Sequence, residues 1–139
     1  MGKAVLITGG AARVGAFIAR GLAADGWHIC LHYFRSEGRA QTLADEIIAA
    51  GGSASIHQAN LSVPQELNTL VTRCGRPLTA LINNASTFKA DTAQDFTTAT
   101  REYHMAVNLD APLRLAQDFA AQTDHGVILN MIDQRVLKP

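Results

Sequence analysis

Short apolar runs alternate along this chain with longer segments that have the periodicity of an amphipathic helix. Residues 4–7 form a continuous apolar run, which is typical of a strand buried on both faces. In residues 13–25 the apolar side chains recur at helical spacing, as at Val14, Ile18 and Leu22. The same patterns predict strands at residues 4–7, 27–34, 53–58, 78–82 and 126–131, and helices at residues 13–25, 37–50, 62–74 and 98–123.

Strands and helices therefore alternate over the whole chain. Such alternation predicts an α/β domain whose parallel strands are joined by right-handed crossovers, with helices on both faces of the sheet. We expect residues 1–139 to form a single Rossmann-type doubly wound domain with the strand order 3-2-1-4-5. In that order, a ligand crevice lies beyond the carboxyl ends of strands one and four.

Two helix boundaries are predicted from single residues. Ser62 and Gln65 have the spacing of a capping box, so we expect the third helix to begin there and to run to about Cys74. Pro112 lies inside the fourth helix, where proline removes one backbone hydrogen bond. We therefore expect an interruption of that helix near Pro112.

Composition narrows the class of protein. A hydrophobic content of 47% with 17% charged residues fits a globular chain with a core. The 12 basic and 12 acidic residues cancel, so nucleic acid is not an expected partner. No run approaches the roughly 20 apolar residues of a membrane span, and the first residues do not resemble a secretory leader. We expect a cytoplasmic protein with no membrane partner.

The two cysteines, Cys30 and Cys74, do not have the spacing of a metal or redox motif. Free buried thiols in a reducing compartment are the simplest interpretation. The sequence therefore predicts no metal site.

The segment T-G-G-A-A-R-V-G at residues 8–15 separates the first strand from the first helix. Glycine at Gly9 lets the backbone turn tightly beside a phosphate, and the start of the helix offers free N–H groups to an anion. Gly15 falls where helix and strand pack closely. In this strand–turn–helix context the segment predicts a site for a dinucleotide pyrophosphate, against the alternative of a plain tight turn.

The end of the second strand indicates which nicotinamide cofactor binds. An acidic residue there usually accepts hydrogen bonds from the ribose of NAD, but residues 32–36 read H-Y-F-R-S. Arg35, Ser36 and Arg13 could instead bind a 2′-phosphate, which favours NADPH. The alternatives are that Arg35 is a solvated loop charge and that Tyr33 serves strand packing.

The spacing T-G-x-x-x-R-x-G resembles the short-chain dehydrogenase/reductase family. That family normally has glycine where Arg13 stands, and arginine there is similar to its pteridine reductase branch. Residues 21–36, the N-N-A-S motif at residues 83–86 and an aspartate at Asp133 also resemble this branch. The resemblance covers essentially all 139 residues, but only about half of a typical family member.

The resemblance implies roles for particular residues. In the family, an aspartate followed by a leucine meets the adenine ring. Asn60 stands here in place of that aspartate, and Leu61 follows it, so we expect both to bind cofactor. The alternative is that Asn60 is an ordinary turn asparagine. The other residues that we expect to bind cofactor are Gly9, Arg13, Val14, Gly15, His32, Tyr33, Arg35, Ser36, Asn84, Ala85 and Ser86.

A pterin-like substrate would be held by Arg13, Ser86 and Phe88, the last by stacking its ring on the heterocycle. Phe88 could equally be a core residue. Asn108 and Asp133 would serve a catalytic proton relay, against the alternatives of a satisfied core asparagine and a solvated loop aspartate.

The family's Tyr-x-x-x-Lys pair does not occur in this chain, since neither Tyr33 nor Tyr103 is followed four residues later by lysine. We therefore expect a fold truncated after strand five, with that strand as an exposed apolar edge, and an inactive fragment. The expected parent is an oxidoreductase that uses NADPH to reduce a dihydropteridine or dihydrofolate. Resemblance alone suggests a homo-oligomer, most simply a homotetramer. The alternatives are a carbonyl or 3-oxoacyl reductase and a non-catalytic NADP(H)-binding module.

Overall fold

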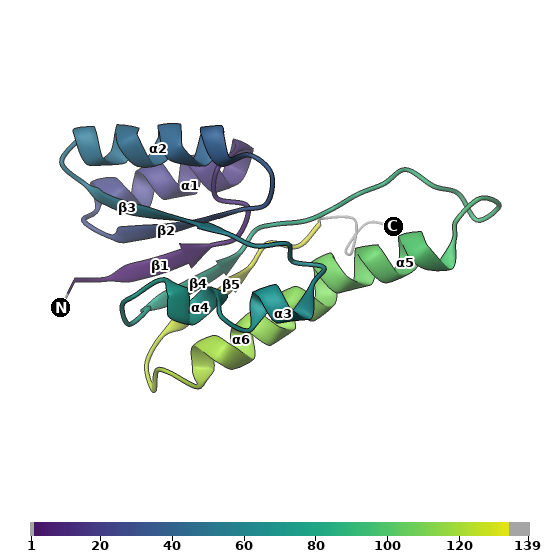
Figure 1. The fold of residues 1–139 in the computed structure, drawn as a ribbon. Helices are drawn as coiled ribbons and strands as arrows, with labels where there is room; N and C mark the ends of the chain where they lie inside the picture. The colour runs from purple at the N-terminus through teal and green to yellow at the C-terminus, as the bar shows by residue number, and fades with distance from the viewer. Residues whose placement is uncertain (1, 134–139) are drawn as a thin grey trace.

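Five parallel strands form one sheet in the order β3-β2-β1-β4-β5, as predicted (Figure 1). The computed structural model describes residues 2–133. The strands are β1 (Ala4–Ile7), β2 (His28–Tyr33), β3 (Ser53–Gln58), β4 (Ala80–Asn83) and β5 (Val127–Asn130). The central strand β1 pairs with β2 and β4 and is completely buried, which explains its unbroken apolar sequence.

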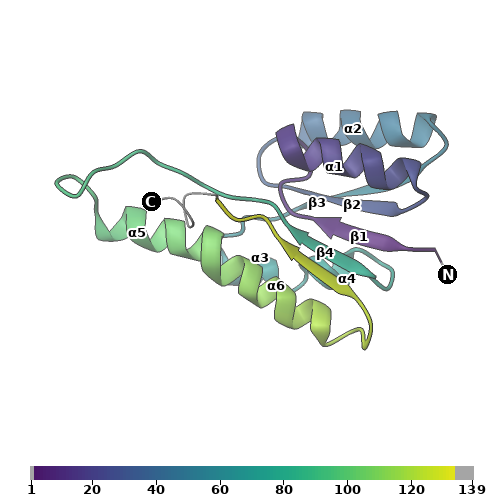
Figure 2. The same ribbon diagram turned by 180° about the vertical axis from the view of Figure 1, so that it is seen from behind.

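Helices cover both faces of the sheet (Figures 1 and 2). One face carries α1 (Arg13–Ala24) and α2 (Glu37–Ala49). The other carries α3 (Pro64–Leu67), α4 (Leu70–Arg73), α5 (Thr98–Met105), the π-helix η1 (Ala106–Asp110) and α6 (Ala111–Ala120). Each face has its own hydrophobic cluster, so the described part of the chain is a doubly wound α/β sandwich.

The predicted helix at residues 62–74 is wrong in two respects. It is broken into α3 and α4, and its N-cap is Val63 with no side-chain capping bond. The physical reason is local competition: Asn60 Oδ1 accepts hydrogen bonds from both the N–H and the hydroxyl of Ser62, at 3.0 and 2.7 Å. These hydrogen bonds close a turn over residues 60–62, and α3 begins one residue later than predicted, with Val63 as its N-cap.

The predicted interruption of the last helix is confirmed as a change of helix type. The backbone continues from α5 to α6, but η1 intervenes and ends just before Pro112. A proline cannot donate to the carbonyl four residues earlier, and a π-helical turn accommodates that loss. As a result, Asn108 lies in the wider turn rather than in regular α-helix.

The edge strand β5 is exposed along its length, as expected, and Val127 is 63% exposed. At the carboxyl end of β4, Asn83 is paired in register with Asn130 and donates from Nδ2 to Asn130 Oδ1 at 2.8 Å. Among the described residues, no helix is long and apolar enough to cross a membrane.

Candidate dinucleotide-binding site

The glycine turn between β1 and α1 has no room for side chains at its two key glycines. Gly9 has a φ of 61°, in the left-handed region that glycine adopts most readily. A Cβ on Gly15 would collide with the carbonyl oxygen of Gly9 and would lie 2.7 Å from Asn84 Nδ2. The backbone of the turn is thus packed directly against the start of α1.

The end of β4 holds the turn from one side. The Thr8 hydroxyl oxygen accepts hydrogen bonds from the N–H groups of Asn84 and Ala85, both at 3.0 Å. In return, Asn84 Nδ2 donates to the carbonyl oxygens of Thr8 and Gly9 at 3.1 and 3.2 Å. The residues after β4 and the glycine turn therefore form one rigid hydrogen-bonded unit.

His32 holds the turn from the other side. Its Nδ1 accepts a hydrogen bond from Gly9 N–H at 3.0 Å, and its Nε2 donates to the carbonyl oxygen of Ala59 at 2.9 Å. The side chain is 2% exposed, and burial lowers the pKa of His32 to about 4. A neutral imidazole with its proton on Nε2 thus links the glycine turn to the residues after β3.

These supports surround a cleft at the carboxyl ends of the strands. Its main part has a volume of about 480 Å³ and continues into a smaller part of about 300 Å³ beside the start of α2. The main part is lined by Gly9, Ala12, Arg13, Val14, His32, Phe34, Asn60, Leu61, Asn84, Ala85, Ser86, Thr87, Tyr103 and Val107. The smaller part adds Ala11, Tyr33, Arg35 and Ser36.

The cleft brings together most residues that the sequence suggested for cofactor binding. Gly15 lies behind the turn rather than in the lining, where it permits close packing. Asn60 lines the cleft, but its Oδ1 is engaged by Ser62. Three further candidates, Phe88, Asn108 and Asp133, line neither part, and Phe88 is 81% exposed.

Arg13 lies at the start of α1 with a φ of 51° and is the one non-glycine residue with positive φ among residues 2–133. A side chain in the left-handed region is strained, which explains why glycine is usual here in the family that the turn resembles. The strained backbone presents an exposed guanidinium at the rim of the main cleft.

The smaller part of the cleft carries the positive charge expected for a phosphate site. The Arg35 guanidinium lies 4.7 Å from the centre of the Phe34 ring, a stacked arrangement that holds it beside the cleft. Ser36 is the N-cap residue of α2 and makes no side-chain capping bond, so its hydroxyl is not engaged in the helix. A cation next to a helix start is suited to an anion.

Phe34 and Tyr103 are lining residues that sequence reasoning missed. Phe34 lies in the segment predicted to bind the 2′-phosphate, but only the residues on either side of it were predicted to contact the cofactor. Tyr103 could have been found from helical spacing, because Val107 and Ala111 follow at intervals of four and both are buried. Lys89 Nζ lies 4.6 Å from the centre of the Tyr103 ring, so the loop after β4 contacts this helix face.

A doubly wound sheet with a glycine turn at its switch point defines a Rossmann-type α/β domain of the kind that binds nucleotides. Comparison with known proteins identifies the family: the family model described as short chain dehydrogenase matches residues 3–135. The chain therefore belongs to this family of oxidoreductases.

Relatives of the chain include several kinds of reductase. Short-chain dehydrogenase/reductase FrzI from Cladobotryum sp is 34% identical over 83% of this chain and 46% of its own length. Pteridine reductase 1 from Leishmania tarentolae is 36% identical over 60% of this chain and 36% of its own length. The crystal structure of FolM alternative dihydrofolate reductase 1 from Brucella canis, complexed with NADP, superposes with a TM-score of 0.92. The two sequences are 35% identical, and the matched region covers 98% of this chain and 57% of the Brucella canis chain.

The chain spans about half the length of FrzI and of the Brucella canis structure.

Proposed function

We propose that the protein binds NADP(H) in the cleft and uses it to reduce a pterin-like heterocycle. The observation that carries the nucleotide preference is the placement of Arg35 and Ser36 in the smaller part of the cleft, at a strand end that lacks an acidic residue before Glu37. A 2′-phosphate there would meet a guanidinium and a hydroxyl at a helix start. An unphosphorylated ribose would find no carboxylate at the strand end itself to accept hydrogen bonds from its hydroxyls, and the nearest one, on Glu37, interacts with Tyr33.

The pyrophosphate is assigned to the glycine turn. Backbone N–H groups at the start of α1 are available to an anion, and Gly9 and Gly15 keep side chains away from it. Asn84, Ala85 and Ser86 would border the nicotinamide side, while Asn60 and Leu61 would border the adenine. When bound, the cofactor supplies a hydride to a C=N bond of the substrate.

Three side chains support the proposal of a pterin-like substrate, two in the cleft lining and one on the loop that continues from it. Arg13 and Ser86 line the cleft and offer hydrogen-bond donors to ring heteroatoms. Phe88 follows on the same loop and exposes a ring that could stack on a flat heterocycle. The names of two relatives, a pteridine reductase and an alternative dihydrofolate reductase, agree with this assignment.

Asn108 and Asp133 are proposed to position a proton for the reduced heterocycle. Both are exposed and outside the cleft lining; the Asn108 amide is bonded to Thr87, on the loop after β4, and Asp133 follows β5. A cytoplasmic homotetramer remains a prediction from resemblance.

The test compares nucleotide binding and turnover. Calorimetric titration should give NADPH an affinity at least tenfold above that of NADH, which corresponds to about 1.4 kcal/mol. Turnover of dihydrobiopterin, dihydrofolate and a 3-oxoacyl thioester is then measured in the full-length gene product, because the relatives are about twice as long as this chain. Preference for the 3-oxoacyl substrate would replace the pterin proposal with a carbonyl reductase, and NADPH binding without any turnover would indicate a sensing module.

A further inference from the structure

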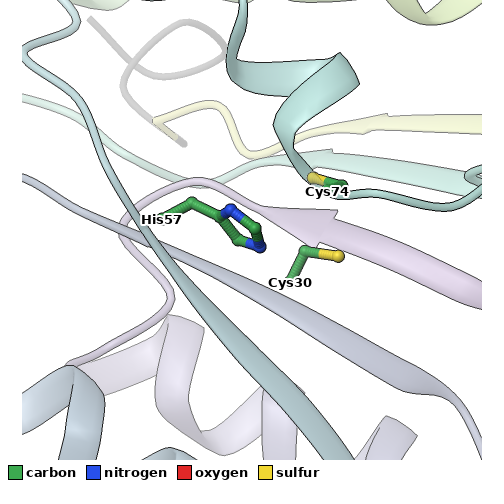
Figure 3. Close-up of side chains that lie close together, drawn as sticks. All are labelled: Cys30, His57 and Cys74. Atoms are coloured by element: carbon green, nitrogen blue, oxygen red, sulfur yellow. The ribbon is translucent and has the colours of Figure 1, made fainter.

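Three potential metal ligands gather on the sheet face opposite α1 and α2 (Figure 3). Cys30 comes from β2, His57 from β3 and Cys74 from the C-cap of α4. Their ligand atoms all lie within 4.8 Å of one another, and all three residues are buried. Within residues 2–133, this is the one such group of histidine, cysteine or acidic side chains.

Strand register explains how these residues meet. Cys30 pairs with Ser55, and His32 pairs with His57, so Cys30 and His57 are diagonal neighbours on one face of the sheet. Cys74 ends α4, which packs on the same face and belongs to the same hydrophobic cluster as Cys30. Both cysteines are free buried thiols, as the sequence predicted. Their proximity to each other and to a histidine was not predicted, since it depends on three separate elements.

A chain of hydrogen bonds orients the imidazole of the cluster. The Ser55 hydroxyl lies 2.8 Å from His57 Nε2 and 3.0 Å from His28 Nε2. His28 Nδ1 in turn lies 2.6 Å from the Ser53 hydroxyl. Polar partners of this kind hold ligand histidines in a fixed orientation in metal sites. The face of β2 and β3 that carries Cys30 and His57 is thus polar where an ordinary core would be aliphatic.

We propose that Cys30, His57 and Cys74 form a binding site for a zinc ion. Two thiolates and an imidazole are ligands that Zn²⁺ prefers. Each thiol would release its proton to solvent as its sulfur binds, and the two thiolate charges would balance the charge of the ion. The filled site would be neutral, which a buried position requires.

The spacing of the donors is close to that of a tetrahedral zinc site. Zinc–sulfur bonds of about 2.3 Å place two sulfurs roughly 3.8 Å apart, so side-chain rotations that move each ligand atom by no more than about 1 Å would complete the site. A water molecule would take the fourth position of a tetrahedral site, because the Ser55 hydroxyl is already the partner of His57 Nε2. The site does not depend on the proposed nucleotide function.

The test is zinc binding by the purified chain after removal of metal with a chelator and full reduction of its thiols. Competition with a chromophoric chelator should give about one Zn²⁺ per chain, and substitution by Co²⁺ should give thiolate charge-transfer absorption. Cys30→Ser, Cys74→Ser and His57→Gln should each weaken binding by at least about tenfold. The matched control is His125→Gln, an exposed histidine on the loop before β5, which should bind zinc as the parent does.

Circular dichroism separates loss of a ligand from loss of the fold. If a variant does not fold, the Co²⁺ spectrum of the parent protein decides, because thiolate absorption requires Cys30 or Cys74 as a ligand. The proposal would be overturned by the absence of that absorption, by zinc binding that survives both cysteine substitutions, or by binding of Cu⁺ with no binding of Zn²⁺.

Discussion

The side-chain amide of Asn108 and the backbone of Thr87 exchange two hydrogen bonds. Thr87 N–H donates to Asn108 Oδ1 at 2.9 Å, and Asn108 Nδ2 donates to Thr87 O at 2.9 Å. The amide thus pairs with the Thr87 backbone as a neighbouring β-strand would, and it joins η1 to the loop that follows β4. Because Thr87 lines the main cleft, Asn108 positions the cleft wall without lining it.

Asn108→Ala should loosen this loop. Removal of both hydrogen bonds from an exposed pair should lower the free energy of unfolding by about 1 kcal/mol and speed amide exchange at Thr87. The measurement is urea unfolding combined with hydrogen exchange. Gln117→Ala, an exposed change on α6, serves as the control. Unchanged exchange at Thr87 would show that the amide pair does not hold the loop.

Gly15→Ala should disrupt the glycine turn. The added Cβ would meet the Gly9 carbonyl and Asn84 Nδ2, so we expect a loss of about 2 kcal/mol in unfolding free energy and loss of nucleotide binding. Gly21→Ala is a matched control in the same helix, because a Cβ there meets nothing within 4 Å. It should stabilise the protein by about 0.5–1 kcal/mol. Similar effects of the two substitutions would contradict the packing account.

Stability should depend on pH through His32. Burial lowers its pKa from 6.5 to about 4 in the folded protein, so the unfolded chain binds the extra proton first as pH falls. The stabilising contribution is complete above pH 6.5 and is lost progressively down to about pH 4, by as much as about 3 kcal/mol. The measurement is urea unfolding across this range.

His32→Gln should flatten that dependence, whereas His125→Gln should retain it. A smaller slope of the same sign should remain in His32→Gln, because burial also lowers the pKa of His28. A His32→Gln protein with the full slope of the parent would assign the effect to other groups.

Arg35→Asp should change nucleotide preference. Loss of a charge-assisted phosphate contact, worth about 1.5–3 kcal/mol, should weaken NADPH binding by about 10- to 100-fold with a smaller effect on NADH. Arg101→Asp, on exposed α5, is the charge-matched control. Equal weakening of both nucleotides by Arg35→Asp would remove this residue from the 2′-phosphate site.

Phe88→Ala should impair substrate use without affecting the fold. The ring is 81% exposed, so the change in unfolding free energy should stay within about 0.5 kcal/mol. In the full-length gene product we expect KM for the pterin to rise about tenfold while NADPH affinity is unchanged. Phe96→Ala, on the same loop, is the control. Unaltered pterin kinetics would exclude stacking by Phe88.

The elements that could be predicted from the sequence are those whose hydrophobic pattern is set by burial alone. Strand β1 is apolar because both faces are buried, and helix α1 is amphipathic because one face meets the sheet. The start of α3 at Val63 could not be predicted from capping spacing, because Ser62 bonds to Asn60 in a turn before the helix.

Within the site, the sequence predicted which residues lie at the cleft better than it predicted which atoms they contact. His32 was expected at the cofactor and lines the cleft, and the bonds of its two ring nitrogens to Gly9 and Ala59 were not predicted. Cys30, His57 and Cys74 could not be related by sequence spacing, since their meeting requires the register of β2 on β3 and the placement of α4. Such relationships arise from packing between elements and have no local sequence signal.

The amide pair at the end of β4 determines how β5 is aligned. Because β5 is exposed on both faces, its side-chain pattern cannot distinguish the observed alignment from one displaced by a residue. A displacement would separate Asn130 from Asn83 and remove the shorter hydrogen bond of a buried amide, at a cost of about 1–3 kcal/mol. The hydrogen bond between Asn83 and Asn130 thus favours one register of β5 on β4, which the exposed side chains of β5 do not specify.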